Sequence, residues 1–511
     1  MTGKPALRRI IIAAIALPSL WIAAPAQTTP TIKVESRIVL LDIAVTDKQG
    51  NPVTDLKPEE FKIYEKKTEQ KMLSFEPPSL HTMPPDTAGK FAVNSTADLA
   101  RIGDSPIAIL VLDELNMNFQ DEVFAREKLI QWLTRQPPVL PQPTALSAVT
   151  YTNFDLLHDF TQDRDVLLAI LKKHAGGVLW RADSKGKVGD QASENMAVTL
   201  GALERISQAM RGVPGRKNLI WVGDGFPSVN VGDTGRTAAD EISTQVHRLS
   251  NIMLHARVTL SVVGPALKGY QPVTIASQAD DDMSSNSTDT SMLATSGEMT
   301  FGGLAPPTGG HSYSGRNDLD AEIGRCVAEG QSYYTISYRP SEPNDDPKEY
   351  RGIHVEVTRP GLVVHTRDGY FGEPTEPEPP GKVSTQQLAF DLNGAATSNF
   401  QYTDLHMKAE RVDQVNFVVR AAAKDMTWRD LPDGRRHADV IVMAACLSRS
   451  GRMLSRSYTP LGSTTEASLA AISLVDATLH VHVTQPPGTV RIRFVVRDMG
   501  NGRVGTADLT P

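Results

Sequence analysis

The sequence has few cysteines, no excess of positive charge and no long hydrophobic run beyond its N-terminus. Its 511 residues contain two cysteines, Cys326 and Cys446, which is too few for a disulfide scaffold. Since both lie in apolar segments, we expect them to be buried rather than paired. The formal net charge of −7 argues against nucleic-acid binding, which depends on basic side chains that neutralise phosphates.

The sequence also lacks the common motifs of catalysis and cofactor binding. It contains no P-loop, no dinucleotide fingerprint and no His-Glu-x-x-His pair. The segment Gly310-His311-Ser312-Tyr313-Ser314-Gly315 is close to the Gly-x-Ser-x-Gly turn that carries a nucleophilic serine. That turn needs a strand before it and a helix after it, whereas a Pro/Gly-rich loop precedes this segment. We therefore expect no catalytic role for Ser312.

A basic and then apolar N-terminus indicates a secretory signal. Lys4, Arg8 and Arg9 precede an apolar run over residues 10–24, and small residues follow at Ala24-Pro25-Ala26. The run is short for a bilayer span. We assign residues 1–26 to a signal peptide and expect export to the periplasm or the extracellular space, with no stable membrane span after cleavage. A short anchor that stays attached is the alternative.

Changes in composition divide the remaining chain into three structured parts and one linker. Strand-like alternation with turn residues predicts a small N-terminal β module over residues 33–80. Apolar runs that alternate with amphipathic helices predict an α/β domain with a late β extension over residues 105–372. A Pro/Glu-rich linker covers residues 373–384. Strands without intervening helices predict a C-terminal β-sandwich over residues 385–511.

Hydrophobic periodicity gives the individual elements of these parts. It predicts helices over 120–135, 163–173, 193–211, 238–256 and 318–329, central strands over 107–112, 148–152, 219–222 and 258–263, late strands over 332–338, 354–358 and 362–366, and C-terminal strands over 415–422, 438–446, 477–483 and 490–497. The central alternation predicts a doubly wound, mostly parallel sheet. The polar segment 271–307, with Asp280–Asp282, is expected to form a surface loop.

Two of the expected buried strands end close to an aspartate. A continuous apolar run leads directly into Asp113, and a second run over residues 218–222 is followed by Gly223 and Asp224. Central strands of parallel sheets are apolar on both faces, and ligands bind beyond the carboxyl ends of such strands. If both strands belong to one sheet, Asp113 and Asp224 converge on a single crevice, which is typical of a cation site.

Five short segments of the central region occur in an order typical of a known family. They are residues 109–113 with Asn116 and Arg126, residues 215–221, Thr308-Gly309-Gly310, residues 332–334 and residues 367–370. Together they resemble the von Willebrand factor A domain, specifically a divergent exported branch described from acidobacteria. The resemblance covers residues 33–372 and leaves the C-terminal part outside. It implies a domain that binds partners through a divalent cation at a metal-ion-dependent adhesion site.

The resemblance also implies roles for individual residues. Asp113 matches the first metal ligand of the family's Asp-x-Ser-x-Ser motif, and Asp224 matches the last aspartate. Hydrophobic residues occupy both serine positions, so only the amides of Asn116 or Asn118 could replace those ligands. Mg²⁺ demands near-ideal octahedral geometry, and Mn²⁺ or Ca²⁺ are the other candidate ions. The alternative is that both aspartates hold together loops or helix N-termini.

The sequence thus predicts an exported, non-enzymatic binding protein that acts in protein–protein or cell-surface adhesion. Its partner is expected in the envelope or the extracellular space. The expected contact residues are Asp113, Asn116, Asn118 and Asp224, and the two aspartates are the metal ligands if an ion binds. Two alternatives stay open. One is a metal-independent structural or assembly subunit of an envelope complex. The other is a metal-dependent hydrolase, which the lack of a recognisable general base disfavours.

Overall fold

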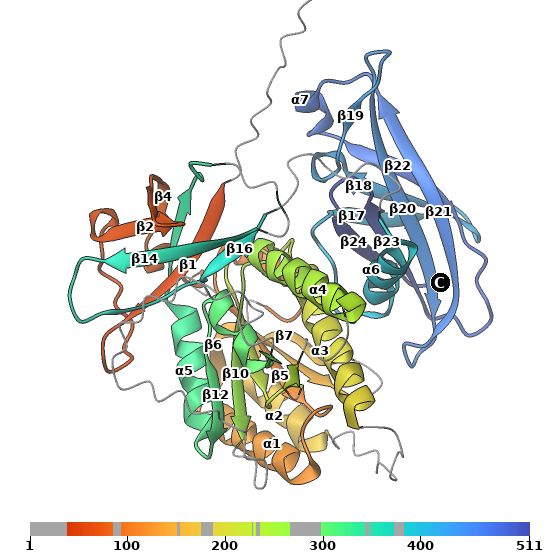
Figure 1. The fold of residues 1–511 in the computed structure, drawn as a ribbon. Coiled ribbons are helices and arrows are strands. Elements are labelled where there is room, and N and C mark those ends of the chain that lie inside the picture. The colour runs from red at the N-terminus through yellow and green to blue at the C-terminus, as the bar shows by residue number, and fades with distance from the viewer. Residues whose placement is uncertain are drawn as a thin grey trace, which may run out of the picture. The chain divides into compact units, whose positions relative to one another are not determined.

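A six-stranded sheet with helices on both faces forms the middle of the chain (Figure 1). The computed structural model describes residues 38–84, 93–150, 154–174, 188–226, 228–230, 236–265, 298–342, 346, 349–372 and 383–511. The expected signal peptide, the Asp280–Asp282 segment and most of the Pro/Glu linker lie outside these residues. Residues Arg37–Pro511 belong to one compact unit.

The central sheet has the strand order β12-β10-β8-β5-β6-β7. Its strands are β5 (Ile107–Asp113), β6 (Val139–Val149), β7 (Phe154–Asp163), β8 (Lys217–Val222), β10 (Val258–Pro265) and β12 (Ser312–Arg316). All neighbours are parallel except β6 and β7. The expected α/β class and mostly parallel sheet are therefore confirmed. β7 and β12 were not predicted, because their polar sequences lack the apolar run that marks the other strands. The strand expected over 148–152 is also misplaced, since β6 ends at Val149.

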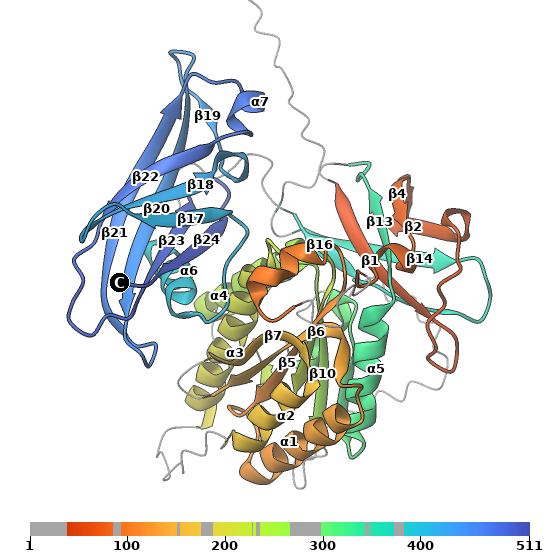
Figure 2. The same ribbon diagram turned by 180° about the vertical axis from the view of Figure 1, so that it is seen from behind.

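Five helices cover the two faces of this sheet (Figure 2). They are α1 (Phe119–Thr134), α2 (Arg164–Lys173), α3 (Val188–Met210), α4 (Arg236–His255) and α5 (Leu319–Gln331), close to the expected ranges. Leu110 and Leu112 of β5 share a core with α1, α2 and α5, whereas Ile109 and Val111 share a core with α3 and α4. β5 is thus buried on both faces, as its continuous apolar run predicts.

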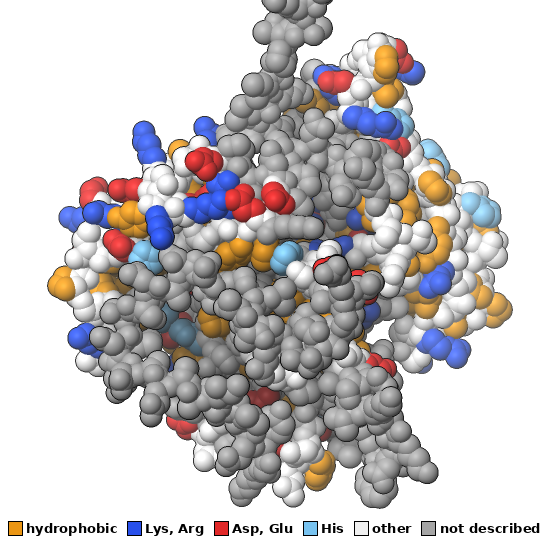
Figure 3. All heavy atoms as spheres, in the orientation of Figure 1, with side chains coloured by type: hydrophobic (Ala, Val, Ile, Leu, Met, Phe, Trp, Pro, Cys, Tyr) orange, Lys and Arg blue, Asp and Glu red, His pale blue; other side chains and the backbone are white. Residues whose placement is uncertain are grey.

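Strands from the start of the chain and from its middle together form two antiparallel sheets. The strands are β1 (Val39–Thr46), β2 (Phe61–Glu65), β3 (Thr68–Gln70), β4 (Met72–Glu76), β13 (Tyr334–Tyr338), β14 (Tyr350–Val357), β15 (Val363–His365) and β16 (Gly369–Phe371), in the orders β15-β1-β13-β4 and β16-β14-β2-β3. The N-terminal module and the late extension therefore share sheets, with Leu41 opposite Ile336. Basic and acidic side chains are interspersed over this part in Figure 3, and Arg359 pairs with Asp55 and Glu60 there.

The remaining strands form a short ribbon and two C-terminal antiparallel sheets. β9 (Val229–Asn230) pairs with β11 (Glu298–Met299). The C-terminal strands are β17 (Met407–Arg411), β18 (Asn416–Ala422), β19 (Arg429–Asp430), β20 (Arg436–Leu447), β21 (Met453–Thr465), β22 (Asp476–His482), β23 (Arg491–Asp498) and β24 (Val504–Leu509). β17, β18 and β22 form one sheet and the others form the second. Phe417 and Phe494, one from each sheet, pack together with their ring centroids 5.3 Å apart.

Two helices correct the expectation that the C-terminal part consists of strands alone. They are α6 (Thr385–Thr397) and the single turn α7 (Leu469–Ile472). The Ser384 hydroxyl accepts a hydrogen bond from the backbone N–H of Gln387 and so starts α6. The cysteines follow the sequence-based prediction, because Cys326 in α5 and Cys446 in β20 are both buried and free.

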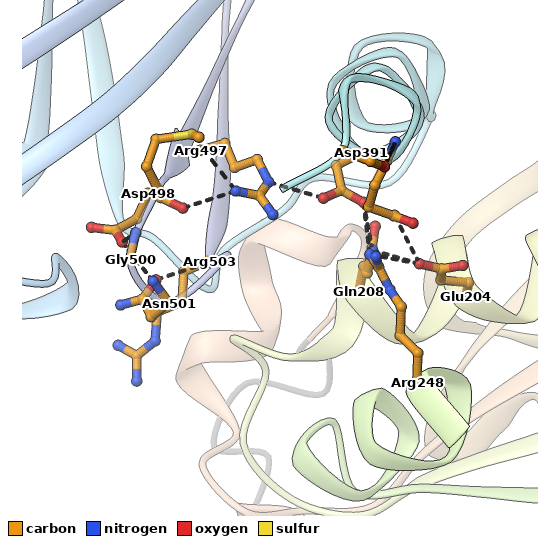
Figure 4. Close-up of polar contacts among 12 residues, drawn as sticks. Glu204, Gln208, Arg248, Asp391, Arg497, Asp498, Gly500, Asn501 and Arg503 are labelled. Carbon is orange, nitrogen blue, oxygen red and sulfur yellow. Dashed lines mark hydrogen bonds and ion pairs between the residues drawn. The ribbon is translucent and has the colours of Figure 1, made fainter. Parts of the chain in front are cut away.

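A buried polar network joins α6 to α3, α4 and β23 (Figure 4). The Asp391 carboxylate, which is 2% exposed, accepts hydrogen bonds from Gln208, Arg248, Gln387 and Arg497. These donors come from four different segments, so one side chain of α6 ties the C-terminal part to the helices on one face of the central sheet. In the part of the chain that the structure describes, no helix is long and apolar enough to cross a membrane.

Candidate functional site

The structure brings the two expected aspartates to the same edge of the central sheet. β5 and β8 are parallel neighbours with Leu112 opposite Val222, so Asp113 and Asp224 both lie at their carboxyl ends. Gly223 has a φ of +141°, and a Cβ on it would lie 2.5 Å from the Cβ of Asp113. The edge is therefore closely packed, and glycine is required at position 223.

Asp113 is fully buried and its carboxylate is saturated by hydrogen bonds from the protein. One oxygen accepts from the indole N–H of Trp221 and the backbone N–H of Gly225, both at 3.0 Å. The other accepts from the backbone N–H groups of Leu115 and Asn116, at 3.2 and 3.0 Å. The Asn116 amide donates to both oxygens. A carboxylate has about four lone-pair positions, so a cation at Asp113 would have to displace existing donors.

Asn116 and Asn118 have structural partners of their own. The Asn116 amide also donates to the Thr199 hydroxyl of α3 at 3.2 Å, and its oxygen accepts from Asn195 at 3.1 Å. The exposed Asn118 is the N-cap of α1, and its side-chain oxygen accepts from the backbone N–H of Asp121 at 3.0 Å. The alternative in which the aspartates hold loops together thus fits Asp113, and Asn118 rather than an aspartate caps α1.

Asp224 differs from the other three predicted residues. Among the residues that the structure describes, its buried Oδ2 atom has no hydrogen-bond partner. Its Oδ1 atom lies so close to Gly264 that a Cβ there would be 1.7 Å away. Burial, followed by the negative charges of Asp113 and Asp121, raises the pKa of Asp224 to about 7. A buried, incompletely bonded carboxylate costs free energy in the folded protein. Such a cost is common at binding sites, where a ligand supplies the missing partner.

Further carboxyl groups surround this edge. Glu114, the residue after Asp113, contacts His174, and that contact raises the pKa of His174. Burial and then the charge of Glu114 raise the pKa values of Glu122 and Asp155. Glu114 thus disfavours the ionised forms of both neighbouring acids, and the charge of His174 offsets part of this effect. The edge favours a cationic ligand, because a positive charge would relieve that repulsion.

The described residues at this edge do not gather a third metal ligand. Among the residues that the structure describes, groups of three His, Cys, Asp or Glu side chains with ligand atoms within 4.8 Å of one another occur at two other places. They are His311 with Glu329 and His365, and Glu76 with His81 and Asp104. Sequence reasoning missed both groups, because each brings together residues from separate segments whose spacing matches no metal-binding motif.

The other sequence motifs of the central region serve the local fold. Ser312 is the first residue of strand β12, so it does not lie on the strand-to-helix turn that a nucleophile elbow requires. The Thr308 hydroxyl accepts from the backbone N–H of Leu260 and donates to the carbonyl of Ala305, at 2.8 and 2.7 Å. Gly309 has a φ of +85°, which favours glycine. Thr308-Gly309-Gly310 thus fixes a turn against β10.

Two comparisons with known proteins do not identify a family for this chain, so a function has to be argued from the site. The chain matches no family model, and the search of curated proteins found no match.

Proposed function

We propose that the protein is an exported, non-enzymatic binding protein whose central part is a von Willebrand A-like domain and whose C-terminal part is a β-sandwich. In this proposal the carboxyl edge of the central sheet binds a basic segment of a protein partner. The observation that carries it is the buried oxygen of Asp224, which lacks a hydrogen-bond partner at the end of a central strand. Ligands bind at that edge in open α/β sheets.

The chemistry of the edge favours a lysine or arginine side chain as the bound group. The pKa of Asp224 is raised to about 7, so a bound cation would shift Asp224 to its charged form and gain a buried ion pair. An arginine could pair with the Asp224 carboxylate through its N–H groups. Asp113 and Asp121 add negative charge near Asp224, and such a potential speeds the approach of a basic partner.

An exposed aromatic side chain adjoins the acidic edge. Phe119, the first residue of α1, is 60% exposed although it is large and apolar. Aromatic residues are enriched among the few residues that contribute most to binding energy. Together with Asn118, Phe119 gives the edge an apolar contact beside a charged one, which is the composition of a protein-binding site rather than of a small-ion site.

The carboxylates of this edge are better suited to direct contact with a partner side chain than to contact through a bound Mg²⁺, Mn²⁺ or Ca²⁺ ion. Mg²⁺ requires six oxygen ligands in octahedral geometry. Asp113 uses its carboxylate for six hydrogen bonds within the protein, which leaves Asp224 to offer a ligand atom. We therefore expect calorimetric titration with each of the three ions to give no heat that depends on Asp224.

A site-specific crosslinking experiment tests the proposal. A photoreactive phenylalanine analogue replaces Phe119 in one variant and Tyr458, an exposed aromatic residue of β21 (44% exposed), in the control. We expect the first variant to crosslink to one envelope protein and the second not to do so. Asp224→Asn should abolish the crosslink, whereas Asp165→Asn, at a side chain 68% exposed on α2, should preserve it. A crosslink that survives Asp224→Asn would instead support the metal-independent structural subunit.

A further inference from the structure

Two histidines and a glutamate from three separate segments converge outside the edge described above. His311 immediately precedes β12, Glu329 lies in the last turns of α5, and His365 is the last residue of β15. Their potential ligand atoms all lie within 4.8 Å of one another. The side chains of His311 and Glu329 are 23% and 15% exposed, so the group is mostly buried but still reachable from solvent.

The contacts within this group are close but incompletely satisfied. His311 Nε2 lies 2.8 Å from Glu329 Oε2, yet this nitrogen is buried without a well-directed hydrogen bond. The rings of His311 and His365 are 4.6 Å apart at 76°. Two nearly perpendicular imidazoles beside a carboxylate can direct their lone pairs to one common point. A simple His–Glu hydrogen bond would not need the second imidazole.

We propose that His311, Glu329 and His365 bind one Zn²⁺ ion and leave a fourth position for water. Zn²⁺ accepts imidazole nitrogen and carboxylate oxygen at about 2.0–2.2 Å, and two histidines with one glutamate form a known type of open zinc site. Ligand atoms around a tetrahedral Zn²⁺ lie about 3.3 Å apart. Side-chain rotations that move the atoms by about 1 Å therefore close the observed group around an ion.

The surroundings shift the pKa values of two of the three side chains, His365 and Glu329. Burial, followed by repulsion from His311, lowers the pKa of His365 to about 4, so its lone pair is free at neutral pH, as metal binding requires. Burial disfavours the charged form of Glu329, but contact with His311 holds its pKa below the usual value. The Thr46 hydroxyl lies 3.4 Å from His365 Nε2 and helps to fix the ring.

One neighbouring charge opposes the ion. The guanidinium of Arg216, the residue before β8, acts on both Glu329 and His365, and its own charge is partly balanced by Asp42. We therefore expect moderate rather than extreme affinity for Zn²⁺. A bound ion would join β15, α5 and the segment before β12, and so would link the antiparallel sheets to the central sheet.

Metal titration of the purified full-length chain tests this site. After dialysis against EDTA, Zn²⁺ titration by calorimetry should show one equivalent bound, and Zn²⁺ should raise the melting temperature. Co²⁺ should give the visible absorption of a tetrahedral nitrogen–oxygen site. Since loss of a single supporting partner of a metal ligand costs about 10–100-fold in affinity, His365→Ala and Glu329→Gln should each weaken Zn²⁺ binding by about 100-fold or more.

Two control variants test whether the loss of Zn²⁺ binding is specific to the ligand residues. His437→Ala, at a histidine of β20 that contacts Asp439, should leave Zn²⁺ binding unchanged. Asp224→Asn should also leave it unchanged, so the zinc site and the proposed partner site can fail independently. Circular dichroism should show that Glu329→Gln, the milder variant, is folded. No bound Zn²⁺ in the parent protein, or equal affinity in the parent, His365→Ala and Glu329→Gln, would overturn the proposal.

Discussion

Replacing Asp391 by asparagine should weaken the attachment of the C-terminal part more than any surface change of the same size. The Asp391 carboxylate is the negative partner of Arg497 at 2.9 Å and of Arg248 at 3.0 Å (Figure 4). Arg248 keeps a second carboxylate, because Glu204 lies 2.8 Å away. Arg497 is 7% exposed, and after the change it would face a neutral amide in place of the carboxylate, beside the carbonyl of Asp498 and the sulfur of Met499.

The expected magnitude follows from the burial of the pair. Removing one partner of a buried ion pair leaves an uncompensated charge and costs about 3–5 kcal/mol. We therefore expect Asp391→Asn to lower the free energy of unfolding by about that amount in urea titrations followed by circular dichroism. Replacing both partners by apolar residues of similar size is often neutral. The double variant Asp391→Leu with Arg497→Met should therefore recover most of the loss.

A matched surface pair gives the control for this experiment. Asp433 and Arg435 form an ion pair in which both side chains are about half exposed, at 48% and 50%, and Asp433→Asn should cause no measurable change. If Asp391→Asn proved as mild as Asp433→Asn, the network in Figure 4 would not hold the C-terminal part in place. A double variant less stable than Asp391→Asn would refute the reasoning from unpaired charge.

Two further predictions concern the central sheet. The pKa of Asp224 is raised to about 7, so the folded state binds its proton more tightly than the unfolded state. The free energy of unfolding should therefore fall by about 2 kcal/mol between pH 4 and pH 8, which is half of the full value for about three pKa units because the side chain is partly exposed. In urea titrations at each pH, Asp224→Asn should remove this slope. A Cβ at Gly310 would lie 1.8 Å from the carbonyl oxygen of Leu260, so Gly310→Ala should lower the free energy of unfolding by about 2 kcal/mol or more, measured by thermal unfolding. The control is Gly434→Ala, where a Cβ would meet no atom within 4 Å although φ is +83°. It should lower the free energy of unfolding by less.

The sequence predicted the fold best where the hydrophobic pattern of a segment matches its burial in the folded protein. The apolar run of β5 and the 3.6-residue spacing of α1 to α5 predict buried strands and amphipathic helices, and the structure contains both. It was less informative where polar residues enter a strand. β7 carries Asp155, His158 and Asp159, so its pairing with β6 depends on an antiparallel neighbour rather than on its own hydrophobicity.

One missed helix left a signal in the sequence. Ser384 is followed three residues later by Gln387, which is the spacing of a helix N-terminus, and the structure begins α6 there. The Pro/Glu linker before it and the strands after it favoured an all-β interpretation of this segment. A helix of 13 residues was thereby overlooked, together with Asp391, the residue that connects it to the central part.

The site residues also include some that the sequence could place and some that it could not. Both aspartates could be placed at one edge, because the carboxyl ends of parallel strands lie together. That Asp113 is saturated while Asp224 is not could not be predicted, because it depends on the indole of Trp221 and the backbone of Gly225. The group of His311, Glu329 and His365 arises from contacts between three elements, and spacing along the chain carries no trace of it.

The partners of β1 set an order in which the chain can finish folding. Its residues pair with β13 and β15, and Thr46 contacts His365 across a separation of 319 residues. A ribosome adds about 5–20 residues per second, so β1 waits about 15–60 s for its neighbours after it has been made. During that interval an apolar strand edge is open to incorrect pairing. We therefore expect newly made chains to depend on a holding chaperone until residue 365 has emerged.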